Sequence, residues 1–160
     1  MLTAYDIMPE VMEAVIFSGL QAAGKTTLYR DRFLETHARI SMDLLRTRAR
    51  EAAFLRVCFE TRTPFVVDNT NPTVAERARY VQPAREAGYK VIGYLVEVDH
   101  AVAAGRNLAR ERKVPAAGLR DVARRLVRPT PEEGFDELWH ATAGPDGWRI
   151  EPLLTTPPLF

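Results

Sequence analysis

The sequence predicts an α/β fold in which a parallel sheet of about five strands is covered by helices on both faces. The first observation is that short apolar runs alternate with longer segments of helical periodicity, joined by short connections. The second is a glycine-containing loop, residues 19–26, that stands between an apolar run and a helical segment. The length of 160 residues suits a single domain, 1–160, with a full hydrophobic core.

The N-terminal elements follow from the hydrophobic pattern. A short leader at 1–12 precedes an apolar and partly β-branched run at 14–18, which indicates a buried strand. The segment 27–36 is expected to be a helix, and 38–41 a short second strand. From 43 to 61 the apolar residues recur with a helical period, which predicts one long helix, 43–61.

The central elements are bounded by proline, glycine and capping residues. The strand predicted at 65–68 is nearly continuous in hydrophobicity, which indicates burial on both of its faces. A helix follows, opened either by Asn71-Pro72 with proline at its first position or by a Thr73-x-x-Glu76 capping box. Pro83 should kink this helix and Gly88 should end it.

The C-terminal third predicts two more strands and two more helices. We expect a strand at 90–96, helices at 99–109 and 117–127, and a last short strand around 148–150. Strands that alternate with helices in this way pair in parallel, and ligands then bind at the carboxyl ends of the strands. That rule brings the loop, the residues after the second strand and those after the third strand to one rim.

The loop Gly19-Leu20-Gln21-Ala22-Ala23-Gly24-Lys25-Thr26 fits the phosphate-binding pattern G-x-x-x-x-G-K-[ST]. Its glycines let backbone N–H groups approach phosphate oxygens closely, and the following helix adds its N-terminal donors. We expect Lys25 to bridge the β- and γ-phosphates of ATP and the Thr26 hydroxyl to be a Mg²⁺ ligand. The predicted nucleotide-binding residues are Gly19, Gln21, Ala22, Ala23, Gly24, Lys25, Thr26 and Thr27.

Asp43 and Arg46 stand three residues apart at the start of the predicted helix 43–61, and therefore on one face of it. At the rim, the Asp43 carboxylate can accept the proton of a hydroxyl that attacks the γ-phosphate. Arg46 can hold a phosphate of the acceptor. The alternative is that Asp43 is only a helix N-cap, a common use of aspartate.

Asp68 ends the predicted strand 65–68 at the same rim. A carboxylate in this place orders the hydration shell of Mg²⁺ beside the loop threonine. The alternative is a turn aspartate, because the following Asn69-Thr70-Asn71-Pro72 run favours turns in any fold.

The region 105–128 carries eight basic and two acidic residues, although the whole chain has a net charge of only +1. We expect an arginine-rich helical lid whose guanidinium groups stabilise the transferring charge, with Arg106 and Arg110, one helical turn apart, as the clamp. Arg120, Arg124 and Arg125 fit a solvated helix face equally well. A basic lid alone does not separate an ATP clamp from a surface for a polyanionic acceptor.

Composition excludes other classes of protein. One cysteine, Cys58, leaves no internal disulfide and suits the cytoplasm, and no apolar run approaches the roughly 18 residues of a membrane helix. The N-terminus has no basic residue before Lys25, unlike a secretory signal. We therefore expect a cytoplasmic protein that does not enter a membrane.

The motifs together resemble the polynucleotide 5′-hydroxyl kinase family over about residues 13–140. They occur in family order: the loop, Asp43-x-x-Arg46, Asp68-Asn69-Thr70-Asn71-Pro72 with Arg77 and Tyr80, Arg106-Asn107-x-x-Arg110, Val114-Pro115 and Glu133-Gly134-Phe135-Asp136-Glu137. The resemblance implies an adenylate-kinase-like P-loop fold of three layers, α/β/α. It also implies transfer of the γ-phosphate of ATP to the 5′-OH end of RNA or DNA.

In that scheme Lys25 and Thr26 hold ATP and Mg²⁺, Asp43 is the general base, Arg46 contacts the acceptor phosphate, and Arg106 or Arg110 clamps the donor. Members of the family often carry a phosphatase or ligase module. Because this sequence has no D-x-D-G-T run, we expect any such activity on a separate partner protein. Two other functions remain open: a kinase of the same fold for a small-molecule hydroxyl, and a non-catalytic module that binds ATP.

Overall fold

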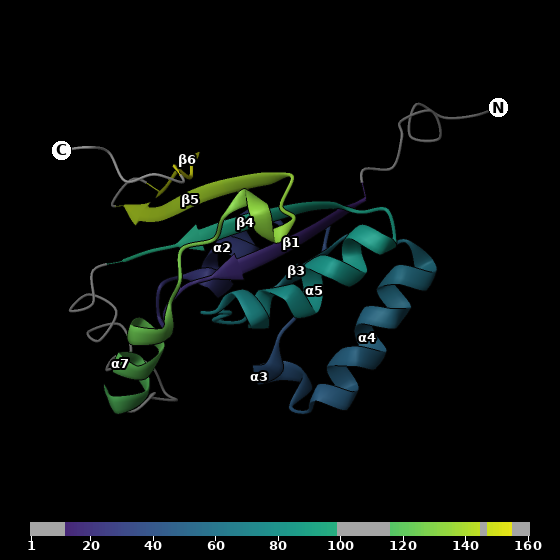
Figure 1. Ribbon diagram of the computed structural model, residues 1–160, viewed down its shortest axis with the longest axis horizontal. Helices are drawn as coiled ribbons and strands as arrows, with labels where there is room; N and C mark the ends of the chain where they lie inside the picture. Colours follow the sequence, from purple (N-terminus) through teal and green to yellow (C-terminus); the bar gives the residue numbers. More distant parts are fainter. Residues whose placement is uncertain (1–11, 99–115, 145–146, 155–160) are drawn as a thin grey trace.

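Six strands form one sheet in the order β2-β3-β1-β4-β5-β6 (Figure 1). The computed structural model describes residues 12–98, 116–144 and 147–154. The strands are β1 Glu13–Ser18, β2 Ala38–Ile40, β3 Phe65–Val67, β4 Lys90–Val96, β5 Glu137–Gly144 and β6 Gly147–Pro152. The described helices are α2 Lys25–Arg32, α3 Met42–Leu45, α4 Arg48–Thr61, α5 Val74–Glu86, α7 Ala116–Arg125 and the short 3₁₀ helix η1 Pro131–Glu133.

The central strand β1 is buried on both faces, and its side chains alternate between two cores. Ala14 and Ile16 lie in the core that also contains residues of α4 and α5, such as Leu55. Val15 and Phe17 lie in the opposite core with Leu28 of α2. Because successive strand residues point to opposite faces, helices cover both sides of the sheet. This arrangement confirms the predicted three layers (Figure 1).

The sheet contains one more strand than expected and one reversed strand. Strands β2, β3, β1, β4 and β5 are parallel, as predicted, but β6 is antiparallel to β5. Only residues 145 and 146 separate β5 from β6, and so short a connection can join antiparallel strands but not parallel ones. The sequence analysis missed β5, because its residues are mostly half-buried and do not form an apolar run.

The predicted helix 43–61 is wrong as a single element. It is divided into α3 and α4 at Arg46, whose φ of 73° ends α3, and at Thr47. The Thr47 side chain accepts a hydrogen bond from the Arg50 N–H at 3.2 Å and so caps α4. A polar cap within a periodic stretch is enough to start a new helix there.

Helix α5 begins at the second of the two predicted caps. The Thr73 and Glu76 side chains each bond the other's backbone N–H, which completes a capping box. The helix continues past Pro83 to Glu86. Helix α7 confirms the helix expected near 117–127, whereas the predicted helix 99–109 lies outside the described residues. None of the described helices is both long and apolar enough to cross a membrane.

Candidate nucleotide-binding and phosphoryl-transfer site

The predicted phosphate loop connects β1 to α2 and is held against the segment after β3 and the end of β4. The Gly19 N–H donates to the Thr70 carbonyl at 2.9 Å, and a Cβ at Gly19 would collide with the carbonyl oxygen of Val96. Gly24 has a φ of 99°, a value that favours glycine, and it is the N-cap of α2. The two loop glycines of the motif are therefore required by backbone geometry.

Lys25 lies against the loop rather than in open solvent. Its Nζ donates to the Gly19 carbonyl at 3.1 Å and to the Leu20 carbonyl at 2.5 Å. The residue is only 7% exposed. The ammonium group is thus located within the curve of the loop, where the N–H groups at the start of α2 also gather.

Thr26 and Asp68 meet at the end of the loop, as the rim rule predicts. The Thr26 hydroxyl donates to Asp68 Oδ2 at 2.9 Å, and Asp68 is buried. Hydroxyl and carboxylate oxygens are ligands that suit Mg²⁺, which otherwise keeps waters and phosphate oxygens. The two residues therefore fit a magnesium ion. Within the described residues no group of three His, Cys, Asp or Glu side chains forms a cation site.

Arg39 is a site residue that the sequence analysis missed. Its Nε lies 2.9 Å from Asp68 Oδ2, and its Nη2 lies 3.3 Å from Thr26 Oγ1. Arg39 belongs to β2, so a charged residue in the middle of a short strand was the only available signal. The contact with Arg39 shows that Asp68 is more than a turn residue.

The loop opens into a cleft with a volume of about 810 Å³ that continues toward α3 and α4. Asp43 lines the same cleft as Lys25 and Thr26. Asp43 is the second residue of α3, whose N-cap is Ser41, so the N-cap interpretation of Asp43 is wrong. The lining residues are Gln21, Ala22, Gly24, Lys25, Thr26, Thr27, Arg39, Met42, Asp43, Arg48, Asp68, Asn69, Thr70, Ala143 and Trp148.

The structure does not bring every predicted residue to this cleft. Arg46 is exposed at the end of α3 and is absent from the described lining, whereas Arg48 at the start of α4 is present. Gly19 and Ala23 support the loop without lining the cleft. The predicted clamp, Arg106 and Arg110, lies outside the described residues.

The run that follows β3 ties the loop to α3. Asn69 Oδ1 accepts the Met42 N–H at 2.9 Å, one residue before Asp43. The Asn71 side chain donates to the Phe17 carbonyl at 2.8 Å, just before the loop. Together with the Asp68–Thr26 contact, these bonds fix the loop and the start of α3 relative to each other.

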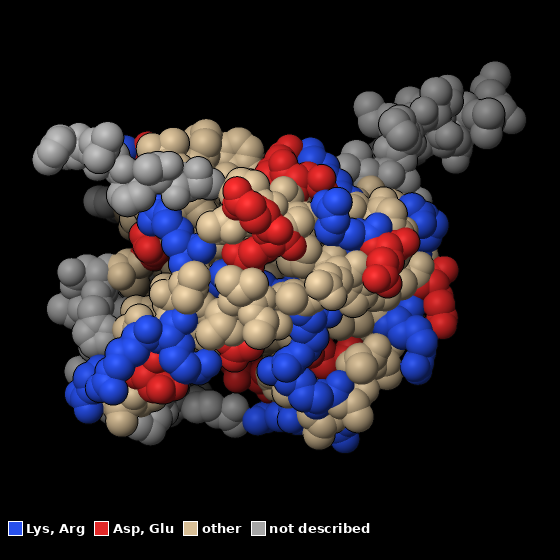
Figure 2. Space-filling model, viewed as in Figure 1, with Lys and Arg blue, Asp and Glu red and all other residues tan. Residues whose placement is uncertain are grey.

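The described part of the basic region carries both bonded and exposed arginines. Arg125 of α7 bonds Asp121 at 3.0 Å and lies 3.5 Å from Glu76 of α5. Arg120 and Arg124 are exposed. Figure 2 shows blue side chains gathered around red ones over α7, at the lower left. This face of α7 is a solvated one with local ion pairs.

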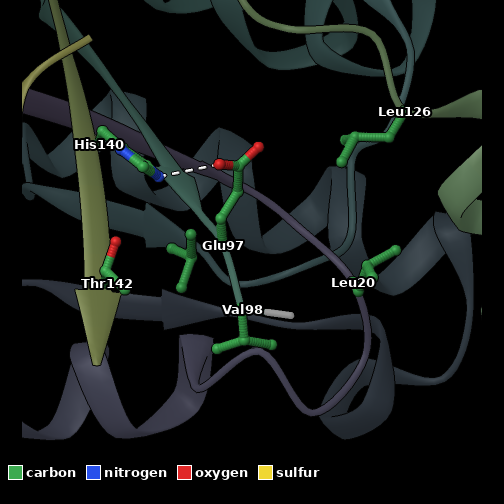
Figure 3. Close-up of a pocket in the computed structure, with 7 residues that line it drawn as sticks. Leu20, Glu97, Val98, Leu126, His140 and Thr142 are labelled. Atoms are coloured by element: carbon green, nitrogen blue, oxygen red, sulfur yellow. Dashed lines mark ion pairs between the residues drawn. The ribbon is translucent and has the colours of Figure 1, made fainter. Parts of the chain in front are cut away.

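A second, smaller cavity of about 350 Å³ lies at the carboxyl ends of β4 and β5 (Figure 3). Its wall is mostly apolar, but His140 Nε2 lies 2.9 Å from Glu97 Oε2 on one side. The cavity reaches the phosphate loop at Leu20. It is lined by Leu20, Val96, Glu97, Val98, Leu126, His140 and Thr142.

A mostly parallel sheet with a phosphate loop after its central strand defines an α/β P-loop nucleoside-triphosphatase fold. Comparison with known protein families agrees with this fold. The family described as an AAA domain matches residues 15–129 of the chain. The chain belongs to this family.

Among curated proteins, the chain is 25% identical over 135 residues to a Schizosaccharomyces pombe protein named bifunctional polynucleotide phosphatase/kinase, covering 81% of the chain and 33% of the relative. The similarity confirms the resemblance drawn from the motifs. The chain spans about a third of the length of the curated relatives it matches.

Two solved structures show the same fold. Chaetomium thermophilum Kti12, crystallised with ADP-AlF₃, superimposes with a TM-score of 0.64 at 17% identity, over 81% of this chain and 88% of that one. A gluconokinase from Sinorhizobium meliloti 1021 gives a TM-score of 0.55 at 17% identity, over 81% and 82%. The fold therefore occurs in proteins with different names, and the residues of the cleft must carry the functional argument.

Proposed function

We propose that this chain transfers the γ-phosphate of ATP to the 5′-OH end of RNA or DNA. The observation that carries the proposal is that Asp43, on α3, lines one cleft with Lys25 and Thr26 of the phosphate loop. A base on one side of a phosphate-binding loop is the arrangement that phosphoryl transfer to a hydroxyl needs. The name of the Schizosaccharomyces pombe relative supports a polynucleotide acceptor.

The reaction would proceed by displacement at the γ-phosphorus. The 5′-hydroxyl oxygen bonds to phosphorus, its proton passes to the Asp43 carboxylate, and the bond from the γ-phosphorus to the β–γ bridging oxygen breaks to release ADP. In this proposal Lys25 holds the β- and γ-phosphates, and Arg106 or Arg110 is the clamp on the donor. Thr26 and Asp68 would hold Mg²⁺, which would neutralise negative charge that develops during the transfer.

A small-molecule kinase is the competing function, because the gluconokinase has the same fold. The third candidate is a module that binds ATP without transferring phosphate. The three differ in where the γ-phosphate goes, so a single assay separates them.

The test incubates the protein with γ-labelled ATP, Mg²⁺ and either a 5′-OH oligonucleotide, its 5′-phosphorylated copy, or gluconate. We expect label on the 5′-OH oligonucleotide only, and none with the Lys25→Ala variant. Parallel RNA and DNA oligonucleotides determine which acceptor is preferred. Label on gluconate alone would favour the small-molecule kinase, and ATP binding without any transfer would favour the third candidate.

A further inference from the structure

We propose that Arg48 binds the first phosphate of the acceptor strand, next to the 5′-hydroxyl, and that Glu51 and Tyr80 position it for this contact. The inference rests on the proposed function and adds to it the residue that distinguishes a polynucleotide end from a neutral alcohol.

Arg48 has the location and the unused donors that this role needs. It is the first residue of α4, its side chain is 53% exposed, and it lines the cleft together with Asp43. Its Nη1 donates to Glu51 Oε1 at 2.8 Å and to the Tyr80 hydroxyl at 3.0 Å. Its Nε and Nη2 make no hydrogen bond to any described residue, so they can bind a phosphate.

Glu51 and Tyr80 form a buried support beneath Arg48. Glu51 is 2% exposed and Tyr80 is 1% exposed. The Tyr80 hydroxyl lies 3.1 Å from both carboxylate oxygens of Glu51. Burial raises the pKa of Tyr80, and the neighbouring Glu51 raises it further. The hydroxyl therefore stays protonated and donates a hydrogen bond to the carboxylate. This support holds the guanidinium through its Nη1 atom.

The same support reaches the helix that carries Asp43. The Asn69 amide nitrogen lies 3.3 Å from Glu51 Oε2 and 3.3 Å from the Tyr80 hydroxyl. The amide oxygen of Asn69 accepts the Met42 N–H at the start of α3. One hydrogen-bonded network therefore positions both Asp43 and Arg48, which should keep the distance between base and guanidinium constant.

The charges in the cleft favour Arg48 for the acceptor. Lys25 lies against the phosphate loop, and Arg39 is paired with Asp68 beside Thr26. Arg48 is the third cation among the described lining residues, and it is paired with Glu51 through Nη1 alone. A nucleic acid end presents a phosphodiester one sugar away from its 5′-hydroxyl, and a gluconate or nucleoside acceptor does not. A guanidinium that lines the same cleft as the base can bind that phosphodiester.

The experiment measures acceptor KM and kcat with two 5′-OH oligonucleotides, one natural and one with an uncharged methylphosphonate at the first linkage. For Arg48→Gln we expect the KM of the natural oligonucleotide to rise roughly 10- to 100-fold, because a charge-assisted hydrogen bond to the phosphate is lost. The KM of the methylphosphonate oligonucleotide and the KM of ATP should not change. Arg48→Lys should restore part of the loss, and Tyr80→Phe should raise the same KM by a smaller factor.

Arg50→Gln is the matched control, because Arg50 is an exposed arginine of α4 that does not line the cleft. Three results would overturn the inference: an equal rise in KM for both oligonucleotides, no rise in the KM of Arg48→Gln, or a larger rise in the KM of Arg46→Gln. Melting temperatures and ATP affinity show whether Arg48→Gln is folded. If it is not, the double variant Arg48→Gln/Glu51→Gln takes its place, because it also removes the buried charge of Glu51. Failure of the unmodified protein to label either oligonucleotide would instead reject the proposed function, and this inference with it.

Discussion

Asp68 is the residue on which the loop and two strands converge. Its carboxylate, at the end of β3, accepts from Thr26 of the loop and pairs with Arg39 of β2. The rim rule for parallel sheets predicted that Asp68 would approach Thr26. No rule predicted that Arg39 and Arg48 would line the cleft, because their positions there depend on the direction of long side chains and not on a motif. The sequence therefore identified the loop and Asp68, but not two of the arginines that line the cleft.

Replacing Asp68 should change the dependence on magnesium. In Asp68→Asn we expect the Mg²⁺ concentration for half-maximal transfer to rise about tenfold, since loss of a supporting ligand typically weakens a metal site 10- to 100-fold. Glu35→Gln, which also removes one carboxylate but is exposed and away from the cleft, is the control. An unchanged magnesium dependence in Asp68→Asn would contradict this role.

The helix starts show what local patterns can and cannot predict. The Thr73-x-x-Glu76 capping box was recognisable in the sequence and marks the start of α5. The break between α3 and α4 was not recognisable, because apolar residues keep a helical period on both sides of Arg46 and Thr47. Yet this break places Arg48 at the cleft and leaves Arg46 outside it. Arg46 has a positive φ of 73°, which periodicity does not reveal.

The capping box of α5 should make stability depend on pH. Burial alone would raise the pKa of Glu76, but hydrogen bonds from Thr73 and the charge of Arg125 outweigh it, and the pKa is lowered. The ionised group therefore stabilises the fold above its unfolded pKa of 4.5, and this contribution is lost as pH falls through the lower, folded value.

For Glu76→Gln we expect a loss of about 0.5 kcal/mol in the free energy of unfolding at pH 7, the typical contribution of an anion at a helix N-terminus. The difference from the parent protein should shrink below pH 4.5 as Glu76 becomes protonated. Urea unfolding at several pH values measures it. A difference that stays constant from pH 7 to acid pH would show that the charge of Glu76 contributes nothing.

The parallel part of the sheet brings together residues that are far apart in the chain. The loop follows β1, Asp43 follows β2 and Asp68 follows β3, and strand order β2-β3-β1 makes these three strand ends neighbours. This much could be predicted, because alternating strands and helices leave few topologies. The β5-β6 edge of the sheet could not be predicted in this way. Strand β5 lacks an apolar run, and the orientation of β6 depends on the two residues before it.

The general-base role of Asp43 is the central claim, and the Asp43→Asn variant tests it most directly. Asparagine keeps the size of the side chain but cannot accept the hydroxyl proton. The measurement is the single-turnover rate of phosphate transfer from ATP to a 5′-OH oligonucleotide, together with the Kd of ATP. The account predicts a rate lower by about 10²- to 10⁴-fold with an unchanged Kd for ATP. Transfer at the parent rate would contradict it.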